Sequence, residues 1–291
     1  MLHEYDFNSR YLALSQGRLH YLDEGEGDTV VLVHGNPTWS YYYRNLLRAL
    51  SRRFRVIVPD HMGCGLSDKP SEYDYTLENH IANLQSLLEY LGVSRTSMVV
   101  HDWGGPIGIG AAADERLDLE RLAILNTAAF RATRIPLRIS LCRWPVIGKL
   151  LVQGLNAFAG AALFMAVTKK MNRQTAEGYL HPYSNWRNRR AIYEFVKDIP
   201  LQTAHRSYET LVRIEKHLRV MKESDVAAAI FWGGKDFCFN DYYYEQWKTH
   251  LPQAEFHYYP DWGHYLLEDG KGEIEKCIEE FLSKEMLLID E

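Results

Sequence analysis

The feature that most constrains the fold is an alternation of short apolar runs with helical patterns. Runs at residues 29–33 (TVVLV), 55–58, 97–101 (SMVVH) and 122–125 (LAIL) resemble strands that are covered on both faces of a sheet. Helical periodicity appears between them at 39–50, 77–91 and 104–113, and a strand at 19–22 is expected from an N-terminal hairpin. The pattern predicts an α/β fold with a mostly parallel sheet and helices on both faces.

This alternation is interrupted once. From about residue 128 to 220 the chain shows helical patterning and no clear buried strand, and the alternation resumes with strands at 226–232 and 255–259 and helices near 242–250 and 273–282. We therefore predict a first core segment at 1–128, an inserted helical cap at 129–220 and a second core segment at 221–291.

Composition narrows the class of protein. The 291 residues are 46% hydrophobic and carry a formal charge of −5, which gives no reason to expect a nucleic-acid partner. The four cysteines form neither a C-x-x-C pair nor a zinc-finger spacing, so free thiols in a reducing cytoplasm are the simplest expectation. The first residues have no basic and apolar regions of a secretory signal.

Residues 150–168 form an uncharged stretch that is long enough to cross a bilayer. Gln153, Asn156 and the flanking Lys149, Lys169 and Lys170 favour a buried or pocket-lining helix instead. Contact with a membrane surface is the second option, and a true span, which we do not expect, is the third.

The sequence VVHDWGG at 99–105 stands where a buried strand turns directly into a helix. This is the site of a nucleophile elbow, whose usual pattern is G-x-S-x-G. Here Asp102 occupies the centre, Gly104 keeps the trailing glycine, and Val100 replaces the leading one. Such a turn projects Asp102 above the sheet beside the backbone N–H groups of the helix start, which suit an oxyanion. The alternative is an Asp that only caps a helix.

Two further segments favour catalysis. Asp236 in GGKD and His264 in DWGH follow the last two predicted strands, so the chain order is nucleophile, acid, base. The backbone of the HGNP segment at 34–37 is placed to complete an oxyanion hole. Asp261 is a weaker candidate for the acid, and the strand at 122–125 ends in Asn126 without a carboxylate.

The motifs HGNPTWS, VPDHMGCGLSDKP, HDWGG and DWGHYLLED resemble the haloalkane dehalogenase family of α/β-hydrolases over nearly the whole chain, least in the cap. The resemblance implies an α/β-hydrolase fold in which Asp102 is the nucleophile and His264 activates water. It also implies that Asn36 and Trp103 hold the leaving halide with side-chain N–H groups and form the oxyanion hole with backbone N–H groups.

An aspartate nucleophile has its own chemistry. A carboxylate can displace a leaving group from saturated carbon, and water can then hydrolyse the resulting ester, whereas a serine would end as a stable ether. Haloalkanes, epoxides and strained lactones are therefore the expected substrate classes. His264 would deprotonate the water while Asp236 fixes the tautomer of its ring.

The segments HGNPTWSYYYR, LNTAAF, HPYSNWRNR, DIPL and KDFCF resemble one branch of the family most. That branch holds β-lactone decarboxylases of bacterial long-chain olefin biosynthesis and dehalogenase-like enzymes. It implies a cis-β-lactone with two alkyl chains, split into an alkene and carbon dioxide. The point of attack by Asp102 stays open.

Three alternatives also stay open. They are a haloalkane dehalogenase, an epoxide hydrolase that uses cap tyrosines as acids, and a non-catalytic scaffold. The available cap tyrosines are Tyr179, Tyr183, Tyr193 and Tyr208, although Asn36 stands where epoxide hydrolases usually carry an aromatic residue.

The apolar cap segment is predicted to line a pocket for a hydrophobic small molecule, with Phe158, Phe164 and Trp186 as candidate pocket residues. An ordinary interface between cap and core is the alternative. We expect no metal and no cofactor, because Asp102 and His264 supply both nucleophile and base. Self-association and assembly with pathway enzymes remain open.

Overall fold

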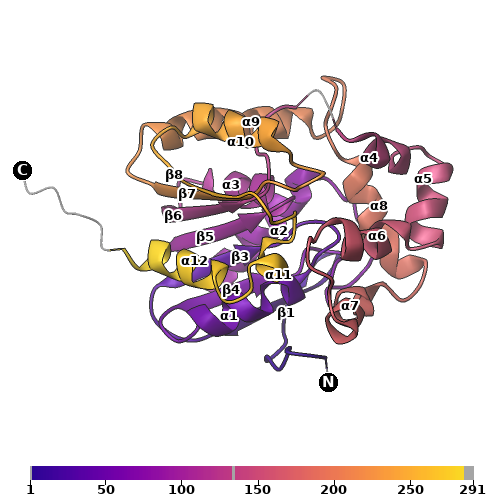
Figure 1. Cartoon of the computed structure of the whole chain (residues 1–291), viewed down its shortest axis with the longest axis horizontal. Coiled ribbons are helices and arrows are strands. Elements are labelled where there is room, and N and C mark those ends of the chain that lie inside the picture. The colour runs from indigo at the N-terminus through magenta and orange to yellow at the C-terminus, as the bar shows by residue number, and fades with distance from the viewer. Residues whose placement is uncertain (1, 133–134, 285–291) are drawn as a thin grey trace, which may run out of the picture.

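The computed structural model describes residues 2–132 and 135–284, and Figure 1 shows a central sheet between helices with a helical cap at one end. The described strands form one sheet in the order β1-β2-β4-β3-β5-β6-β7-β8. The pairs β1–β2 and β2–β4 are antiparallel and all other neighbours are parallel, which confirms the hairpin and the mostly parallel sheet. The strands are β1 (Arg10–Leu14), β2 (Gly17–Glu24), β3 (Thr29–Val33), β4 (Arg55–Pro59), β5 (Arg95–His101), β6 (Asp118–Leu125), β7 (Ala227–Gly233) and β8 (Glu255–Tyr259).

Helices cover both faces of this sheet, and each face has its own apolar cluster. One face packs against α2 (Leu77–Tyr90), α3 (Gly104–Ala112), α9 (Tyr208–Lys222) and α10 (Asp241–His250). The other packs against η1 (Ser40–Tyr43), α1 (Arg44–Leu50), α11 (Leu266–Asp269) and α12 (Ile274–Ser283). Because β3 and the later part of β5 are buried on both faces, apolar residues follow one another without a break at 30–33 in β3 and at 98–100 in β5.

The expected interruption lies between β6 and β7, where the described residues contain helices and no strand. The helices of this region before α9 are α4 (Leu137–Cys142), α5 (Ile147–Lys149), η2 (Leu150–Gly154), α6 (Ala157–Met165), α7 (Arg173–Leu180), η3 (His181–Tyr183), η4 (Arg187–Arg189) and α8 (Arg190–Lys197). Helix α9 packs with Leu211, Ile214 and Leu218 in the same apolar cluster as α2 and α3. The division of the chain at residues 129 and 220 remains a prediction.

The uncharged stretch at 150–168 forms two helical segments and not one helix, which corrects that part of the expectation. Both segments line a pocket that also contains Asp102, which agrees with the expected pocket-lining role. Asn156 adopts a left-handed backbone with φ of 54° and separates η2 from α6. Within the described residues no single helix is long and apolar enough to span a membrane; the segments Ile147–Gly154 and Ala157–Met165 pass that test only together, bent by 70°. Leu150, Leu155 and Phe164 are exposed, so part of this apolar stretch lies on the surface.

Close contact between α3 and the sheet depends on glycine. A Cβ added at Gly104 would lie 1.9 Å from the carbonyl oxygen of Val33, which is backbone and cannot move aside. By contrast, a Cβ at Gly160, in α6, would meet no atom within 4 Å. The first turn of α3 therefore sits against β3 only because residue 104 has no side chain.

We expect Gly104→Ala to lower the free energy of unfolding by about 1–3 kcal/mol, since the added methyl group forces α3 away from β3. The matched change Gly160→Ala should leave stability unchanged or raise it, because alanine favours a helix over glycine. Urea unfolding followed by circular dichroism measures both. Equal stability of the two variants would contradict this account of the packing.

Candidate active site

Asp102 lies on a sharp turn between β5 and α3. Its φ of 51° is in the left-handed region, which costs a non-glycine residue about 1–3 kcal/mol. Three interactions hold the turn: the N–H of Asp102 donates to the carbonyl of Asn126 (3.3 Å), and the Asp102 carbonyl accepts from Gly105 N–H (3.0 Å) and from the Thr127 hydroxyl. The turn has the form of the nucleophile elbow expected from the sequence.

The Asp102 carboxylate lies beside His264, which in turn contacts Asp236. The Nδ1 atom of His264 lies 2.7 Å from Asp236 Oδ2, and its Nε2 atom lies 3.6 Å from Asp102 Oδ2. All three residues are buried. They follow β5, β7 and β8, so the carboxyl ends of three parallel strands bring them to one edge of the sheet.

Asp236 is fixed by donors from two elements. Its Oδ1 accepts from the backbone N–H groups of Cys238 (2.6 Å) and Phe239 (3.0 Å), and its Oδ2 accepts from Asn126 Nδ2 (2.8 Å). The Asn126 amide oxygen accepts from Gly233 N–H (2.8 Å), which locks the orientation of the amide. The sequence analysis noted Asn126 only for its lack of charge, and it missed this bridge between β6 and the acid.

His101 is a second contributor that the sequence analysis missed. It is fully buried, and its Nε2 donates to the carbonyl of His264 (2.9 Å), while its ring lies 4.4 Å from the His264 ring. Tyr42 stacks on the other side at 4.5 Å. Burial lowers the pKa of His101 well below its usual value, so it stays neutral and serves to position the His264 backbone.

The charge state of His264 follows from its neighbours. Burial alone lowers its pKa, but the nearby carboxylates of Asp236 and Asp102 outweigh that effect and raise the pKa to about 10. The resting site therefore holds an imidazolium between two carboxylates. Burial and the Asp236 charge raise the pKa of the Cys238 thiol well above its usual value, so it is not a competing nucleophile.

The HGNP segment forms one wall of the site. Asn36 donates its backbone N–H to Asp102 Oδ1 at 2.7 Å, which is the position expected of an oxyanion-hole donor. Its side-chain Nδ2 donates to the carbonyl of Ile192 in α8 (3.2 Å), so this amide also ties the core to the cap. Within the described chain the half-buried Trp103 has no hydrogen-bond partner for its indole N–H, and its side chain borders the cavity beside Asp102.

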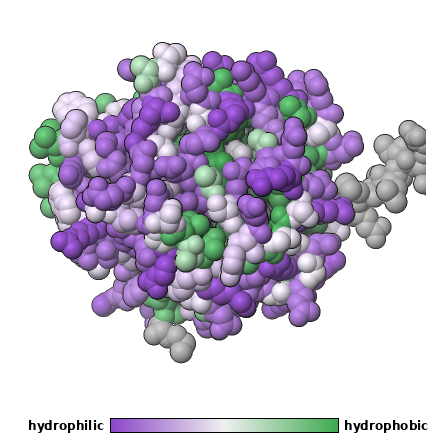
Figure 2. All heavy atoms as spheres, turned by 180° about the vertical axis from the view of Figure 1, so that it is seen from behind, coloured by the Kyte–Doolittle hydropathy of each residue, from purple (hydrophilic) through white to green (hydrophobic). Residues whose placement is uncertain are grey.

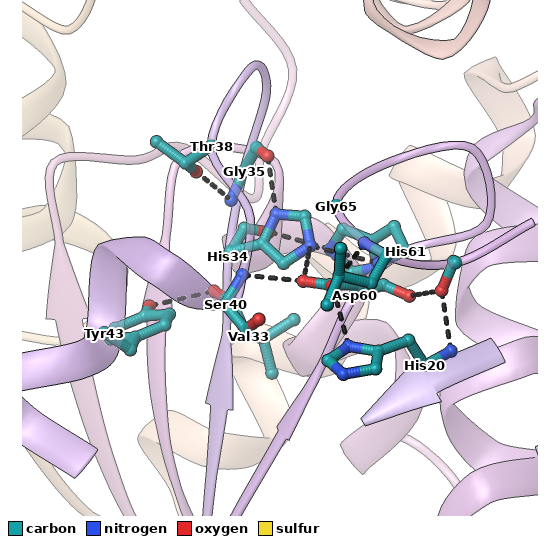
Figure 3. A network of polar contacts seen from close by, with 12 residues as sticks. His20, Val33, His34, Gly35, Thr38, Ser40, Tyr43, Asp60, His61 and Gly65 are labelled. Atoms are coloured by element: carbon teal, nitrogen blue, oxygen red, sulfur yellow. Dashed lines mark hydrogen bonds and ion pairs between the residues drawn. The ribbon is translucent and has the colours of Figure 1, made fainter. Parts of the chain in front are cut away.

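A buried polar network supports this wall from below (Figure 3). Asp60 accepts from the backbone N–H of Ser40 (2.6 Å) and from His20 Nδ1 (2.8 Å). Burial alone would raise the pKa of Asp60, but the nearby His20 outweighs it and the pKa is lowered. His34 donates from Nδ1 to the carbonyl of Gly35 and accepts at Nε2 from the His61 backbone N–H. The network fixes the loop that carries Asn36 and has a structural role.

Two apolar cavities meet at the carboxylate. Cavity A extends beneath the start of the cap and α9, and cavity B extends beneath α4, η2 and α6. Residues found only in cavity A include Trp103, Ala128, Phe130, Leu201, Leu211 and Tyr243, and residues found only in cavity B include Cys142, Leu151, Ala161, Met165, His264 and Tyr265. Both cavities share Asn36, Asp102, Ile139, Phe158 and Cys238.

The three candidate pocket residues of the cap do not lie at one site. Phe158 borders both cavities, as the sequence analysis expected. Phe164 is 74% exposed and Trp186 is 43% exposed, and neither borders cavity A or B. On α6, Phe158, Ala161 and Met165 share the inner face at helical spacing, whereas Phe164 falls outside it. The expectation for Phe164 and Trp186 is therefore corrected.

The cap tyrosines also lie away from the reaction centre. Tyr179 donates to Glu268 (2.6 Å), Tyr183 to the carbonyl of Thr38 (3.4 Å) and Tyr193 to that of Pro145 (3.1 Å). Neither these three nor Tyr208 borders cavity A or B. The arrangement gives no support to an epoxide hydrolase that uses cap tyrosines as acids. In the described residues no group of His, Cys, Asp and Glu side chains is arranged to hold a metal ion.

We expect the pKa of His264 to fall in an Asp236→Asn variant, because the charge of Asp236 contributes most to raising it. A raised pKa stabilises the folded state below the ordinary value of 6.5, and this contribution is lost as the pH rises through about 10. The variant's loss of unfolding free energy should therefore be largest below pH 6.5 and shrink towards pH 10. Imidazole NMR titration and urea unfolding measure the two effects.

Asp261→Asn is the matched control. Asp261 is an exposed carboxylate three positions before His264 in the sequence, and it pairs with Lys235 at 2.7 Å. It should leave the His264 titration unchanged. A stability loss in Asp236→Asn that is the same at all pH values would contradict the assignment.

Comparisons with known proteins agree with this geometry. Residues 28–144 match the family model of the alpha/beta hydrolase fold. A cis-3-alkyl-4-alkyloxetan-2-one decarboxylase of Shewanella oneidensis is 43% identical over 96% of this chain and 89% of its own length. The protein of the same name from Xanthomonas campestris is 38% identical over 97% of this chain and 98% of its own.

Haloalkane dehalogenases match in sequence and in fold. One from Mycolicibacterium paratuberculosis is 32% identical over 74% of this chain and 75% of its own length. The crystal structure of the haloalkane dehalogenase DbeA from Bradyrhizobium elkani superposes with a TM-score of 0.86 at 21% identity, covering 96% of this chain and 98% of that one. The chain belongs to the haloalkane dehalogenase family of α/β-hydrolases, and it shares nearly its full length with the oxetan-2-one decarboxylases named above.

Proposed function

We propose that this chain is a β-lactone decarboxylase that converts a cis-3-alkyl-4-alkyloxetan-2-one into an alkene and carbon dioxide, with Asp102 as the nucleophile. The two relatives that match nearly the whole chain carry this activity in their names. The observation that carries the proposal within the structure is the meeting of two apolar cavities at Asp102.

A dialkyl lactone has the shape of this site. Its four-membered ring bears alkyl chains on two adjacent carbons, so a ring held at Asp102 needs two diverging apolar spaces. Cavities A and B share Phe158 and Asp102 and then separate. One chain in each cavity is stabilised by roughly 0.8 kcal/mol for every buried CH₂ group. A terminal haloalkane would fill only one of them.

The reaction needs no other reactant. Asp102 Oδ2 attacks ring carbon 4, and the bond from that carbon to the ring oxygen breaks, leaving an ester to Asp102 and a free carboxylate on carbon 3. The bond from carbon 3 to the carboxylate then breaks, and its electron pair forms the double bond while Asp102 leaves carbon 4. The attack inverts carbon 4, and the carboxylate on carbon 3 and Asp102 on carbon 4 then leave from opposite faces. Together these two steps turn a cis lactone into a cis alkene. Neither water nor a net proton is consumed.

The other residues of the site act on charge. Asn36 N–H holds Asp102 Oδ1, which leaves Oδ2 to attack. Trp103 borders cavity A beside Asp102, and in this proposal its indole N–H, which has no partner among the described residues, donates to the carboxylate released from the ring. His264, whose pKa is raised to about 10 in the resting site, enters the reaction as an imidazolium. The carboxylate released from the lactone ring replaces the negative charge that Asp102 loses, so His264 keeps its proton and stabilises first that carboxylate and then the returning Asp102 carboxylate. Asp236 and Asn126 hold its ring in place.

Haloalkane hydrolysis is the second candidate, because the same triad can perform it. When Asp102 becomes an ester it loses its negative charge, and His264 loses one of the two carboxylates that raise its pKa. His264 can then release its proton and activate water. An alkyl ester without an internal carboxylate has no route except this hydrolysis.

The two reactions differ in the fate of Asp102 oxygen. After turnover of a cis-dialkyl lactone in water labelled with heavy oxygen, we expect no label in the peptide that contains Asp102, because water never attacks the ester. After turnover of a long-chain bromoalkane the same peptide should gain label. Mass spectrometry of the digested protein reads both, and Asp102→Ala should abolish either turnover. Labelled Asp102 and a β-hydroxy acid product from the lactone would contradict decarboxylation.

A pair of substitutions that each fill one cavity tests the two-cavity arrangement. Ala128→Phe should narrow cavity A and Ala161→Phe should narrow cavity B, since each alanine borders only one cavity. With two regioisomeric lactones that exchange a short and a long chain, we expect each variant to lower kcat/KM at least about tenfold for one isomer, a loss of roughly 1.4 kcal/mol in transition-state binding. The affected isomer should differ between the variants. Equal loss for both isomers in both variants would contradict one chain per cavity.

Partners beyond the substrate are a separate question. Self-association and assembly with the enzyme that supplies the lactone remain predictions from the sequence, and size-exclusion chromatography of the chain alone and with that enzyme addresses them.

A further inference from the structure

The outer side of the cap carries an exposed apolar surface. We call it the cap face and define it by Leu137, Trp144, Val146, Ile147, Leu150 and Trp186, all of which are exposed. Val146 is 79% exposed and Leu137 76%. Figure 2 shows hydrophobic side chains gathered at its left edge, which corresponds to the edge formed by α4 and α5 in Figure 1. Monomeric soluble proteins rarely leave neighbouring large apolar side chains exposed in this way.

The stretch of chain that carries all of the cap face except Trp186 has no acidic residue. Residues 121–176 contain no Asp or Glu, although the whole chain has a formal charge of −5. Arg138, Lys149 and Arg187 are exposed, and none of them pairs with a carboxylate within the described residues. Lys149 Nζ lies 5.9 Å from the centre of the Trp186 ring, so cation and aromatic ring share the same surface.

We propose that the cap face docks on the surface of an anionic phospholipid bilayer. Apolar and tryptophan side chains beside unpaired Lys and Arg are the composition of segments that lie at the boundary between headgroups and acyl chains. Basic residues near an anionic leaflet are attracted to its negative surface potential, so they add to the binding from the apolar side chains. The break at Asn156 turns α6 away from η2, which leaves Leu150 and its neighbours to lie along a surface.

The same elements border the substrate site. Leu151 and Cys142 line cavity B from η2 and α4, and the same two helices carry Leu150 and Leu137 of the cap face. A docked cap therefore holds cavity B against the lipid, where a dialkyl substrate of the proposed function would dissolve. The docking itself depends only on the cap face and holds whatever the substrate is.

A bilayer fits this surface better than a second copy of the chain. A symmetric contact between two cap faces would bring like charges together, with Lys149 and Arg187 on both sides. The centres of protein interfaces are also depleted in lysine. Anionic headgroups remove this repulsion and accept the cations.

Vesicle flotation tests the proposal without turnover, so its result does not depend on the lactone assay. The probes are vesicles of phosphatidylcholine alone and of phosphatidylcholine with phosphatidylglycerol. We expect at least about tenfold tighter binding to the anionic vesicles, weakened by salt. Val146→Glu/Leu150→Glu should lose at least about tenfold in binding, because both changes place a carboxylate in the apolar layer. Lys149→Glu/Arg187→Glu should reduce binding to anionic vesicles selectively.

The matched control is Tyr90→Glu/Val220→Glu, since these residues are 63% and 60% exposed outside the cap face. It adds the same charge and should bind vesicles like the wild type, and circular dichroism checks that all variants fold. Binding that is equal for both vesicle types, or equally weakened by the control, overturns the proposal. The proposal is also overturned if the chain does not bind vesicles. If the chain instead self-associates, and only Val146→Glu/Leu150→Glu abolishes that self-association, the cap face is a contact with a second copy.

Discussion

The contact between His264 and two buried carboxylates is the interaction on which the site depends. Removing two carboxylates and an imidazolium from water is costly, and mutual attraction compensates only when the remaining lone pairs are hydrogen-bonded. Here the backbone N–H groups of Asn36, Cys238 and Phe239 and the amide of Asn126 provide those bonds. Each donor comes from a loop at the carboxyl end of a strand. The order of the strands in the sheet therefore brings together the donors that compensate the cost of burying these charges.

The cap must satisfy two requirements at once. Its inner side lines cavities A and B beside the buried Asp102, and these apolar surroundings strengthen the electrostatic contacts of the carboxylate. Its outer side remains apolar, and on our proposal it meets lipid. A single buried helix could not do both, because an apolar helix has no free side once it is enclosed. The break at Asn156 divides the apolar stretch into pieces that each have an inner and an outer side.

Sequence reasoning succeeded where local pattern and position agree. The strands before Asp102 and Asp236 are marked by buried apolar runs, and a glycine follows or ends each of the three strands close to Asp102, Asp236 and His264. These elements appear where they were predicted. The helix ending at Gly92, with φ of 67°, is of the same kind.

The rest depends on contacts between segments far apart in the chain. Nothing near Asn126 indicates that its amide will bond to Asp236, because that contact arises only when β6 and β7 pair. In the cap, composition predicts an apolar stretch but not which side of it faces inward. Phe158 and Phe164 have similar sequence surroundings. Only the position at which the helix starts after Asn156 determines that Phe158 lines the cavities and that Phe164 is exposed.

One triad can support either hydrolysis or decarboxylation, and the substrate decides between them. In the proposed mechanism a haloalkane loses its leaving group, and the ester formed on Asp102 must be hydrolysed by water that His264 activates. With a β-lactone the leaving group stays attached as a carboxylate on the neighbouring carbon, so the next step is intramolecular and has the advantage of proximity. That step needs a positive charge beside the carboxylates more than it needs a base. A histidine whose pKa is raised to about 10 by two neighbouring carboxylates supplies this charge at neutral pH.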